Sequence, residues 1–218
     1  MAERSIDKRR ILILILDILV VLSVAYAVLG MVFAKDNSAL VTGGRGAFKY
    51  YTVLSNVFCA LTSLVCVIFM LARKDSSLPV PLYLLHLAGS CVVSVTLIVV
   101  IIFLGPTMGF GNMFVGVSFW LHLFAPVLSI ISQMLLRPQS EIRLRSTVFA
   151  VVPTILYGAV YIIVNAVNWT GKSNPVTDMY GFLRWGWAIG AILLVAICLI
   201  NWLVAVLFRK CAGKGKTN

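Results

Sequence analysis

The chain has 218 residues, of which 61% are hydrophobic and 11% are charged, and its formal net charge is +11. This composition excludes an ordinary soluble domain, in which about half of the residues are apolar and about a quarter are charged. A basic excess of this size suits a nucleic-acid partner, but here the basic residues lie between apolar runs, which favours a membrane protein.

Six apolar runs are each long enough to cross ~30 Å of hydrocarbon as a helix. The runs cover residues 11–34, 50–72, 81–104, 112–136, 147–167 and 185–208. Because the connecting segments are short, we expect no appended soluble domain. The sequence therefore predicts a single transmembrane domain over residues 1–218, an all-α bundle of six membrane-spanning helices.

Most of the 18 basic residues fall on one side of this six-helix arrangement. They are Arg4, Lys8, Arg9, Arg10, Arg73, Lys74, Arg137, Arg143, Arg145, Arg209, Lys210, Lys214 and Lys216. Since Lys and Arg accumulate in cytoplasmic loops, this side is predicted to be cytoplasmic, with both termini on it. Membrane lipids, and not nucleic acid, are the expected partners. The sequence leaves the oligomeric state open.

Asp17 in the first run predicts a polar layer near the cytoplasmic side. An ionisable side chain inside a membrane is rarely left unpaired. His86 in the third run and Asn201 in the sixth lie at a similar depth, so we expect Asp17 to bond with one or both of them. This secondary polar layer is interpreted as a contact that joins helices, with a proton or cation site as the alternative.

The second run carries Thr52, Ser55 and Asn56 on one helical face in its outer third. Hydroxyl groups in membrane helices often only bond their own backbone or join two helices. A hydroxyl beside a base and hydrogen-bond donors also forms the set that nucleophilic catalysis requires. Thr52 or Ser55 is therefore a candidate nucleophile, and Asn56 and Ser55 are candidate donors to an oxyanion.

His122 lies in the outer half of the fourth run, four residues before Pro126. Proline has no backbone N–H, so the carbonyl of His122 loses its helical partner. An ionisable ring at this depth normally faces a bundle interior or a cavity. His122 is the candidate general base, with a donor to a neighbouring carbonyl as the structural alternative, and a catalytic pair requires that its ring face the hydroxyl of Thr52.

Further polar residues suggest a cavity between the second, fourth and fifth runs. Ser118 lies one turn before the candidate base, and Tyr157, Tyr161 and Asn165 repeat every four residues in the fifth run. Because bare polar groups are unfavourable in lipid, these faces should turn toward one another. We predict that they line a substrate cavity, although the tyrosines are also compatible with simple packing.

No cofactor and no metal are expected from the sequence. The five cysteines form no C-x-x-C pair, which predicts neither a disulfide nor a zinc site. The two histidines, His86 and His122, lie at different depths, and a bis-histidine haem requires them at one level.

Four short segments carry a family resemblance: FKYYTVLSN at 48–56, HLFAP at 122–126, Pro153 followed four residues later by Tyr157, and YGFL at 180–183. In this order they resemble the androgen-induced-gene and androgen-dependent TFPI-regulating protein family of multi-pass membrane proteins, more closely its bacterial branch. The resemblance implies a bacterial cell membrane as the location. It covers the second, fourth and fifth runs and the last external loop, within roughly residues 48–185.

The resemblance implies an intramembrane threonine hydrolase of lipid esters, because animal members of that family cleave fatty acid esters of hydroxy fatty acids with a Thr and a His. Carried over by position, Thr52 is the nucleophile and His122 the base. The chain departs from the family pattern in having Ser132 and Gln133 where an acidic residue is expected, and Gly181 and Arg184 where the last motif has proline and an acid. If those residues support the site, the substrate differs or hydrolase activity is absent.

Two other classes of function remain open. The first is a small proton- or ion-coupled membrane transporter that uses Asp17, His86 and Asn201, although the sequence contains no apparent inverted repeat or pair of broken helices. The second is a non-catalytic integral membrane scaffold with an incidental polar core.

Overall fold

The computed structural model describes residues 7–33, 44–73 and 77–212. In this part of the chain, six helices are long and apolar enough to cross a membrane, which confirms the predicted all-α six-helix membrane architecture. Two short strands, β1 (Ser77–Leu78) and β2 (Arg137–Pro138), pair in parallel at one end of the bundle. The protein is a multi-pass integral membrane protein.

Several of the six spans are composite. The first two are α1 (Lys8–Phe33) and α2 (Tyr51–Arg73), the latter preceded by the 3-10 turn η1 (Gly44–Lys49). The third joins α3 (Val80–Val99), the π-helical turn η2 (Val100–Leu104) and α4 (Gly105–Met108), and the short α5 (Phe110–Met113) follows. The fourth joins α6 (Val117–Phe119), the π-helical turn η3 (Trp120–Phe124) and α7 (Ala125–Leu135). The last two are η4 (Leu144–Val151) with α8 (Val152–Val167), and α9 (Trp187–Cys211).

The fourth span begins at Val117 rather than at residue 112, where the apolar run predicted it. Gly109 and Gly116 adopt φ angles of 88° and 56°, a region that other residues rarely occupy, and the chain turns at both. The segment between them forms α5 outside the span. An apolar run alone cannot reveal such a break.

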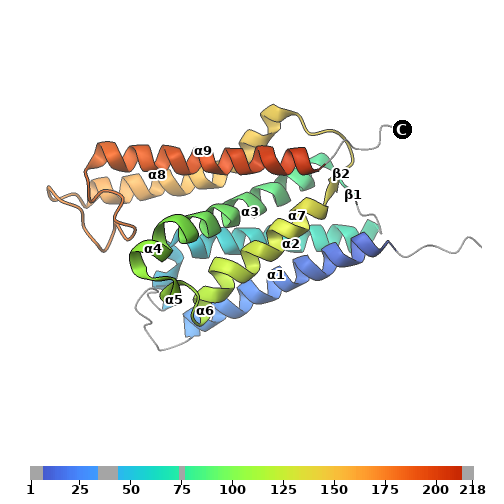
Figure 1. Cartoon of the computed structure of the whole chain (residues 1–218), viewed down its shortest axis with the longest axis horizontal. Coiled ribbons are helices and arrows are strands. Elements are labelled where there is room, and N and C mark those ends of the chain that lie inside the picture. The colour runs from blue at the N-terminus through green and yellow to red at the C-terminus, as the bar shows by residue number, and fades with distance from the viewer. Residues whose placement is uncertain (1–6, 34–43, 74–76, 213–218) are drawn as a thin grey trace, which may run out of the picture.

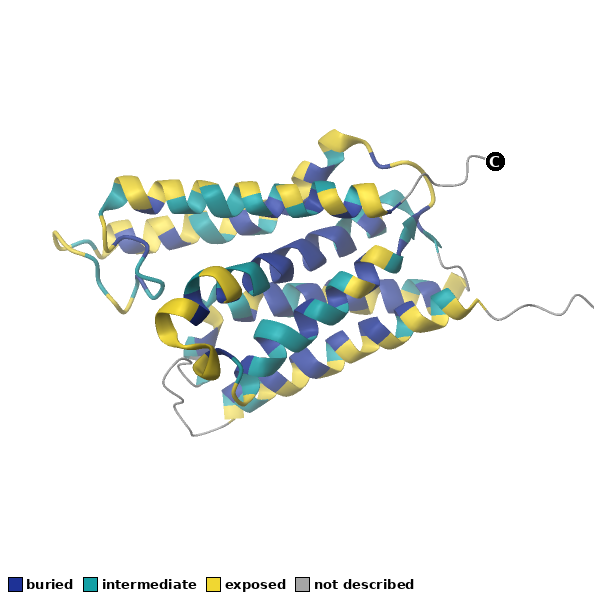
Figure 2. Cartoon of the chain, in the orientation of Figure 1, coloured by how far each residue is buried: buried dark blue, intermediate teal, exposed yellow. Residues whose placement is uncertain are grey.

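The bundle consists of a four-helix group and a helix pair. Helices α1, α2, α3 and α7 pack against one another, whereas α8 and α9 lie side by side along one flank and contact α3 (Figure 1). In the most apolar part of each span, 67% of the α3 residues are buried but only 17% of the α9 residues (Figure 2). Helix α3 is therefore the centre of the fold, and α9 has the surface of a lipid-facing helix.

Arginine side chains cap helix ends at one end of the bundle. Arg9 Nε donates to the carbonyl of Leu135 at 2.7 Å, and Arg10 Nη2 donates to that of Met70 at 2.9 Å. These carbonyls lie in the last turns of α7 and α2, where backbone oxygens have no helical partner. These two basic residues thus satisfy carbonyl groups at the ends of helices.

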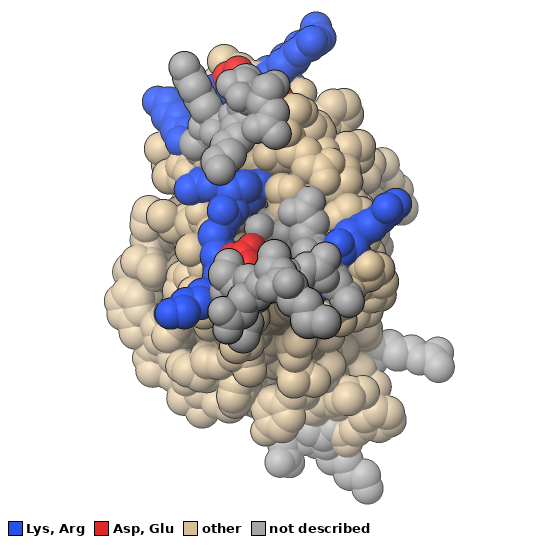
Figure 3. Space-filling view, turned by 90° about the vertical axis from the view of Figure 1, so that its right-hand side faces the viewer, with Lys and Arg blue, Asp and Glu red and all other residues tan. Residues whose placement is uncertain are grey.

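We call this end the basic end, and Figure 3 shows Lys and Arg gathered on it. Its basic residues include Arg9, Arg10, Arg73, Arg137, Arg143, Arg209 and Lys210. The opposite end, which we call the loop end, carries η1, α4, α5 and residues 168–186. Arg4, Lys74, Lys214 and Lys216 lie outside the described residues. That the basic end faces the cytoplasm stays a prediction.

Both π-helical turns precede a proline. Pro126 has no N–H for the carbonyl of His122, and the helix widens there, so that the N–H of Ala125 bonds the carbonyl of Trp120, five residues back. The same arrangement joins Gly105 to Val100 before Pro106. The sequence predicted a freed carbonyl at His122, and the structure adds that His122 lies inside a widened turn.

Candidate functional site

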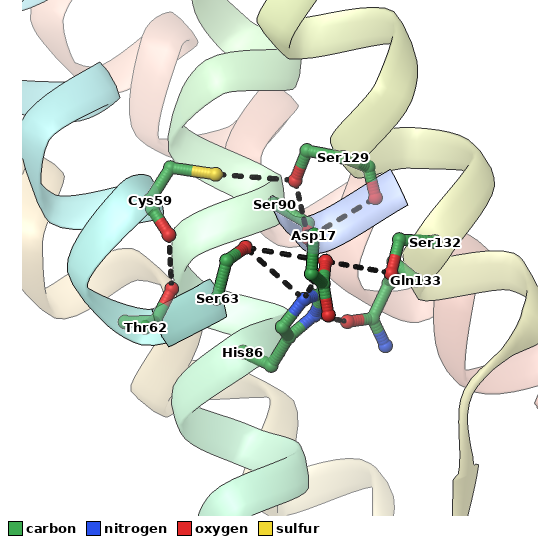
Figure 4. Close-up of polar contacts among 9 residues, drawn as sticks. All are labelled: Asp17, Cys59, Thr62, Ser63, His86, Ser90, Ser129, Ser132 and Gln133. Carbon is green, nitrogen blue, oxygen red and sulfur yellow. Dashed lines mark hydrogen bonds and ion pairs between the residues drawn. The ribbon is translucent and has the colours of Figure 1, made fainter. Parts of the chain in front are cut away.

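Polar side chains gather in two layers. The inner cluster lies toward the basic end and consists of Asp17, Cys59, Ser63, His86, Ser90, Ser129, Ser132 and Gln133 (Figure 4). The outer site lies toward the loop end and consists of Thr52, Ser55, Asn56, His122 and Tyr180. The two layers share α2 and the fourth span.

Asp17 is the centre of the inner cluster. Its Oδ1 lies 3.1 Å from Nε2 of His86 and accepts hydrogen bonds from Ser132 at 2.8 Å and Ser63 at 3.3 Å. Asp17 is 0% exposed and His86 is 1% exposed. Asp17 therefore pairs with His86, as the sequence predicted, and helices α1, α2, α3 and α7 meet at this pair.

Gln133 contacts the second ring nitrogen of His86. Its Oε1 lies 2.7 Å from Nδ1 of the ring. The ring of His86 is thus held between Asp17 of α1 at one nitrogen and Gln133 of α7 at the other. The resemblance expected an acidic residue where this chain has Ser132 and Gln133, and both of these side chains belong to the inner cluster, with Ser132 bonded to Asp17 and Gln133 to His86.

The remaining members extend the inner cluster along the bundle. The hydroxyls of Ser90 and Ser129 lie 2.8 Å apart, and Cys59 donates to Ser129 at 3.1 Å. Sequence reasoning did not single out Ser63 or Ser90, since a serine in a membrane helix is usually unremarkable. Their spacing was the available signal, because Ser63 continues the face of Asn56 two turns on, and Ser90 lies one turn after His86.

Asn201 does not belong to this layer. Its Nδ2 donates to the hydroxyl of Thr154 at 2.5 Å, and that hydroxyl lies 2.8 Å from the hydroxyl of Tyr51. Asn201 therefore joins α9 to α8 and, through Thr154, to α2. The depth estimate placed it with Asp17, but the rotation of α9 turns it toward α8.

In the outer site, Asn56 joins two helices. Its Nδ2 donates to the carbonyl of Thr52 at 2.8 Å and to the carbonyl of Leu121 at 3.0 Å. Both of its N–H bonds are thus used, which corrects the expectation that Asn56 donates to an oxyanion. Its effect is to hold the turn of α2 that contains Thr52 against the residue that precedes His122.

Ser55 is likewise committed to other partners. Its hydroxyl donates to the carbonyl of Thr52 at 3.1 Å and lies 3.0 Å from the hydroxyl of Thr96. The prediction that Ser55 is a nucleophile or an oxyanion donor therefore has less support than the prediction for Thr52. Among the described residues, the Thr52 hydroxyl makes no hydrogen bond.

His122 is oriented by the backbone of α5. Its Nδ1 lies 2.8 Å from the carbonyl oxygen of Met113. A carbonyl only accepts, so Nδ1 carries the proton and Nε2 of the neutral ring keeps its lone pair. No hydrogen bond joins His122 to Thr52 among the described residues, and the catalytic pairing of the two side chains stays a prediction.

Tyr180 was not predicted as a site residue. Its hydroxyl accepts from the backbone N–H of Tyr51 at 2.7 Å, at the start of α2 and next to Thr52. Burial raises the pKa of Tyr180 well above its ordinary value, so the phenol keeps its proton at neutral pH. The YGFL segment was the available signal, but only the fold places it beside α2.

Two apolar cavities lie on either side of α8. The larger, about 950 Å³, runs between α8 and helices α2 and α3, and we call it the α3–α8 groove. The smaller, about 520 Å³, is lined by Thr52, Tyr180 and residues of α3, α8 and α9, and we call it the Thr52 cavity. Tyr51 and Tyr157 line both and separate them.

The predicted cavity residues divide between these features. Tyr157 and Tyr161 line the α3–α8 groove, but neither lining contains a residue of the fourth span, so neither cavity is the one predicted between the second, fourth and fifth runs. Ser118 is buried in α6, and Asn165 donates to the carbonyl of Tyr161 at 2.9 Å, so neither lines one of the two cavities. His122 also lies outside both linings.

Comparison with known proteins adds no relative. No family model matches the chain, and no curated protein and no solved structure matches it significantly. The architecture and the site therefore rest on the chain's own residues.

Proposed function

We propose that this protein is an intramembrane hydrolase of lipid esters of the fatty-acyl class, with Thr52 as the nucleophile and His122 as the base. One observation carries the proposal: the four segments behind the family resemblance meet around the start of α2. Tyr180 accepts from the N–H of Tyr51, and Tyr157 donates to the carbonyl of Lys49 at 2.9 Å. Asn56 bonds the carbonyl of Leu121, next to the HLFAP segment at 122–126.

The surroundings of His122 suit a base. The carbonyl of Met113 fixes the tautomer in which Nε2 is free to take a proton. The residue also lies in a π-helical turn, and such turns occur frequently at functional sites. Catalytic histidines are commonly oriented in this manner, by a third group that accepts a hydrogen bond from the ring nitrogen not used as the base.

The surroundings of Thr52 suit a nucleophile. Its hydroxyl has no hydrogen-bond partner among the described residues, and the residue lines a cavity of apolar side chains. Tyr180 lines the same cavity, and its protonated phenol is a donor for the negative charge that develops on an attacked carbonyl. An acyl chain would reach this cavity laterally, from the bilayer.

In the proposed reaction, Oγ1 of Thr52 attacks the ester carbonyl while Nε2 of His122 takes the hydroxyl proton. The tetrahedral intermediate then breaks its bond to the alcohol, which leaves with that proton. Water, deprotonated by His122, next cleaves the acyl-threonine ester and restores the hydroxyl. Proton transfer requires the hydroxyl and Nε2 to approach to about 3 Å in the substrate complex, a contact that is often looser without substrate.

The test is hydrolysis of a long-chain nitrophenyl ester by the purified protein in detergent. We expect Thr52→Ala to abolish turnover. Thr62→Ala is the matched control on the same helix, because the Thr62 hydroxyl only bonds the carbonyl of Cys59 at 2.8 Å. Equal rates for Thr52→Ala and the wild type would refute the proposal.

A further inference from the structure

The lining of the α3–α8 groove follows two helices lengthwise. Its α3 side consists of Val80, Pro81, Leu84, Leu85, Ala88 and Val92, and its α8 side consists of Val152, Pro153, Leu156, Tyr157, Val160, Tyr161 and Val164. Each set forms one stripe over 13 residues, or ~18 Å of helix from the first residue to the last. The groove therefore extends through more than half of ~30 Å of hydrocarbon.

The groove also opens toward the bilayer. Leu156 and Val160 line it and are 62% and 59% exposed. A molecule dissolved in the membrane thus has access to it from the side, past α8. The end near the start of α3 and α8 is apolar, with Val80, Phe149 and Val152 in its lining.

The end of the groove toward the loops differs in charge. Lys49 is the one charged residue in the lining. Its ammonium lies 5.3 Å from the ring centroid of Tyr50, and among the described residues it forms no ion pair. A cation without an acidic partner at the mouth of an apolar groove is suited to an anionic headgroup.

The other polar groups near Lys49 are already engaged. Tyr157 donates to the carbonyl of Lys49, Tyr161 donates to Asp178, and the Ser55 hydroxyl bonds Thr52 and Thr96. The ammonium of Lys49 is the group that remains for a ligand.

We propose that the α3–α8 groove binds one long-chain fatty acid, with its chain between α3 and α8 and its carboxylate at Lys49. The chain fills a space that is apolar along its whole length, and the carboxylate supplies the missing counter-charge. This site is distinct from the Thr52 cavity, and the proposal does not depend on hydrolysis at Thr52.

The test uses the full chain in nanodiscs of phosphatidylcholine, with a hexadecanoic acid that bears a photoreactive diazirine. Crosslinks are mapped by mass spectrometry. We expect them on groove residues of α3 and α8, with saturable labelling that hexadecanoic acid displaces and hexadecanol displaces at least about tenfold less well. Thr52→Ala should label normally, so failure of the hydrolase proposal would leave this result unchanged.

Two variants, each with a matched control, test separately how the charge of Lys49 and the apolar lining of the groove contribute to binding. Lys49→Met should weaken labelling at least about tenfold, whereas Lys49→Arg should retain it. Lys172→Met, which changes an exposed lysine of the loop 168–186, should have no effect. Leu156→Trp should block the groove, whereas Ile163→Trp, an exposed position on the same helix outside both linings, should not. Labelling spread evenly over lipid-facing residues, or equal displacement by the alcohol, would overturn the proposal.

Discussion

The inner cluster and the outer site use the same kinds of side chain but differ in how completely these side chains are bonded. In the inner cluster, Asp17 Oδ1 has three hydrogen-bond partners, and each ring nitrogen of His86 has at least one. Two buried atoms there, Asp17 Oδ2 and Gln133 Nε2, have no hydrogen-bond partner among the described residues. In the outer site, neither Nε2 of His122 nor the hydroxyl of Thr52 has a partner among the described residues.

The two regions also differ in access. Both cavities lie beside the outer site, and neither is lined by Asp17 or His86. Buried groups that bond one another contribute to the packing of helices, whereas an unpaired group that lines a cavity, as Thr52 does, is available to a ligand. We infer that the inner cluster holds the four-helix group together and that the outer site carries the chemistry.

The largest effect expected from this contrast concerns the two histidines. His122→Gln should leave the protein inserted and folded but lower kcat by roughly 10²–10⁴-fold, because a general base contributes that much. His86→Gln should leave kcat per folded molecule largely intact. The measurement is ester hydrolysis normalised to the monodisperse fraction in detergent. If His86→Gln is the inactive variant, the functional site is the inner cluster.

Asp17 provides the converse test, on stability. Asp17→Ala leaves the buried groups of His86, Ser63 and Ser132 without their shared partner, which should cost about 3–5 kcal/mol. The double variant Asp17→Asn/His86→Gln replaces both ionisable groups by amides that can bond each other and should regain part of that loss. Thermal unfolding in detergent measures both, and an unchanged midpoint for Asp17→Ala would show that the pair does not hold the helices.

A smaller effect is expected at Tyr180. Tyr180→Phe keeps the ring packing but removes the hydroxyl that faces the start of α2. We expect kcat to fall about tenfold with little change in KM, the signature of an interaction that strengthens in the transition state. Tyr83→Phe, which removes a buried hydroxyl near the inner cluster, is the control and should leave both parameters unchanged. A change confined to KM would assign Tyr180 to substrate binding alone.

Much of the architecture could be predicted from the sequence because the length of an apolar run is itself the physical requirement for crossing a bilayer. The pairing of Asp17 with His86 also followed, since a lone buried charge is too costly to leave unpaired. The break at Gly116 could not be predicted, because a glycine is compatible with a helix and with a turn until the surrounding packing selects one.

The site was less predictable because the sequence gives the face of a helix but not its rotation against a neighbour. Asn56 was placed correctly on the face toward the fourth span, yet its donors bond two carbonyls. Gln133 shares a span with His122 but lies at the level of His86. Tyr180 lies in a loop that only the folded chain brings to Thr52.

The most direct test of the account is the position of a covalent adduct. A fluorophosphonate with a long alkyl chain is allowed to react with the wild-type protein in detergent, and the modified residue is identified by peptide mass spectrometry. The account predicts a single adduct on Thr52, which Thr52→Ala and His122→Gln both abolish. An adduct on Ser63 or Ser90, beside His86 in the inner cluster, would contradict it.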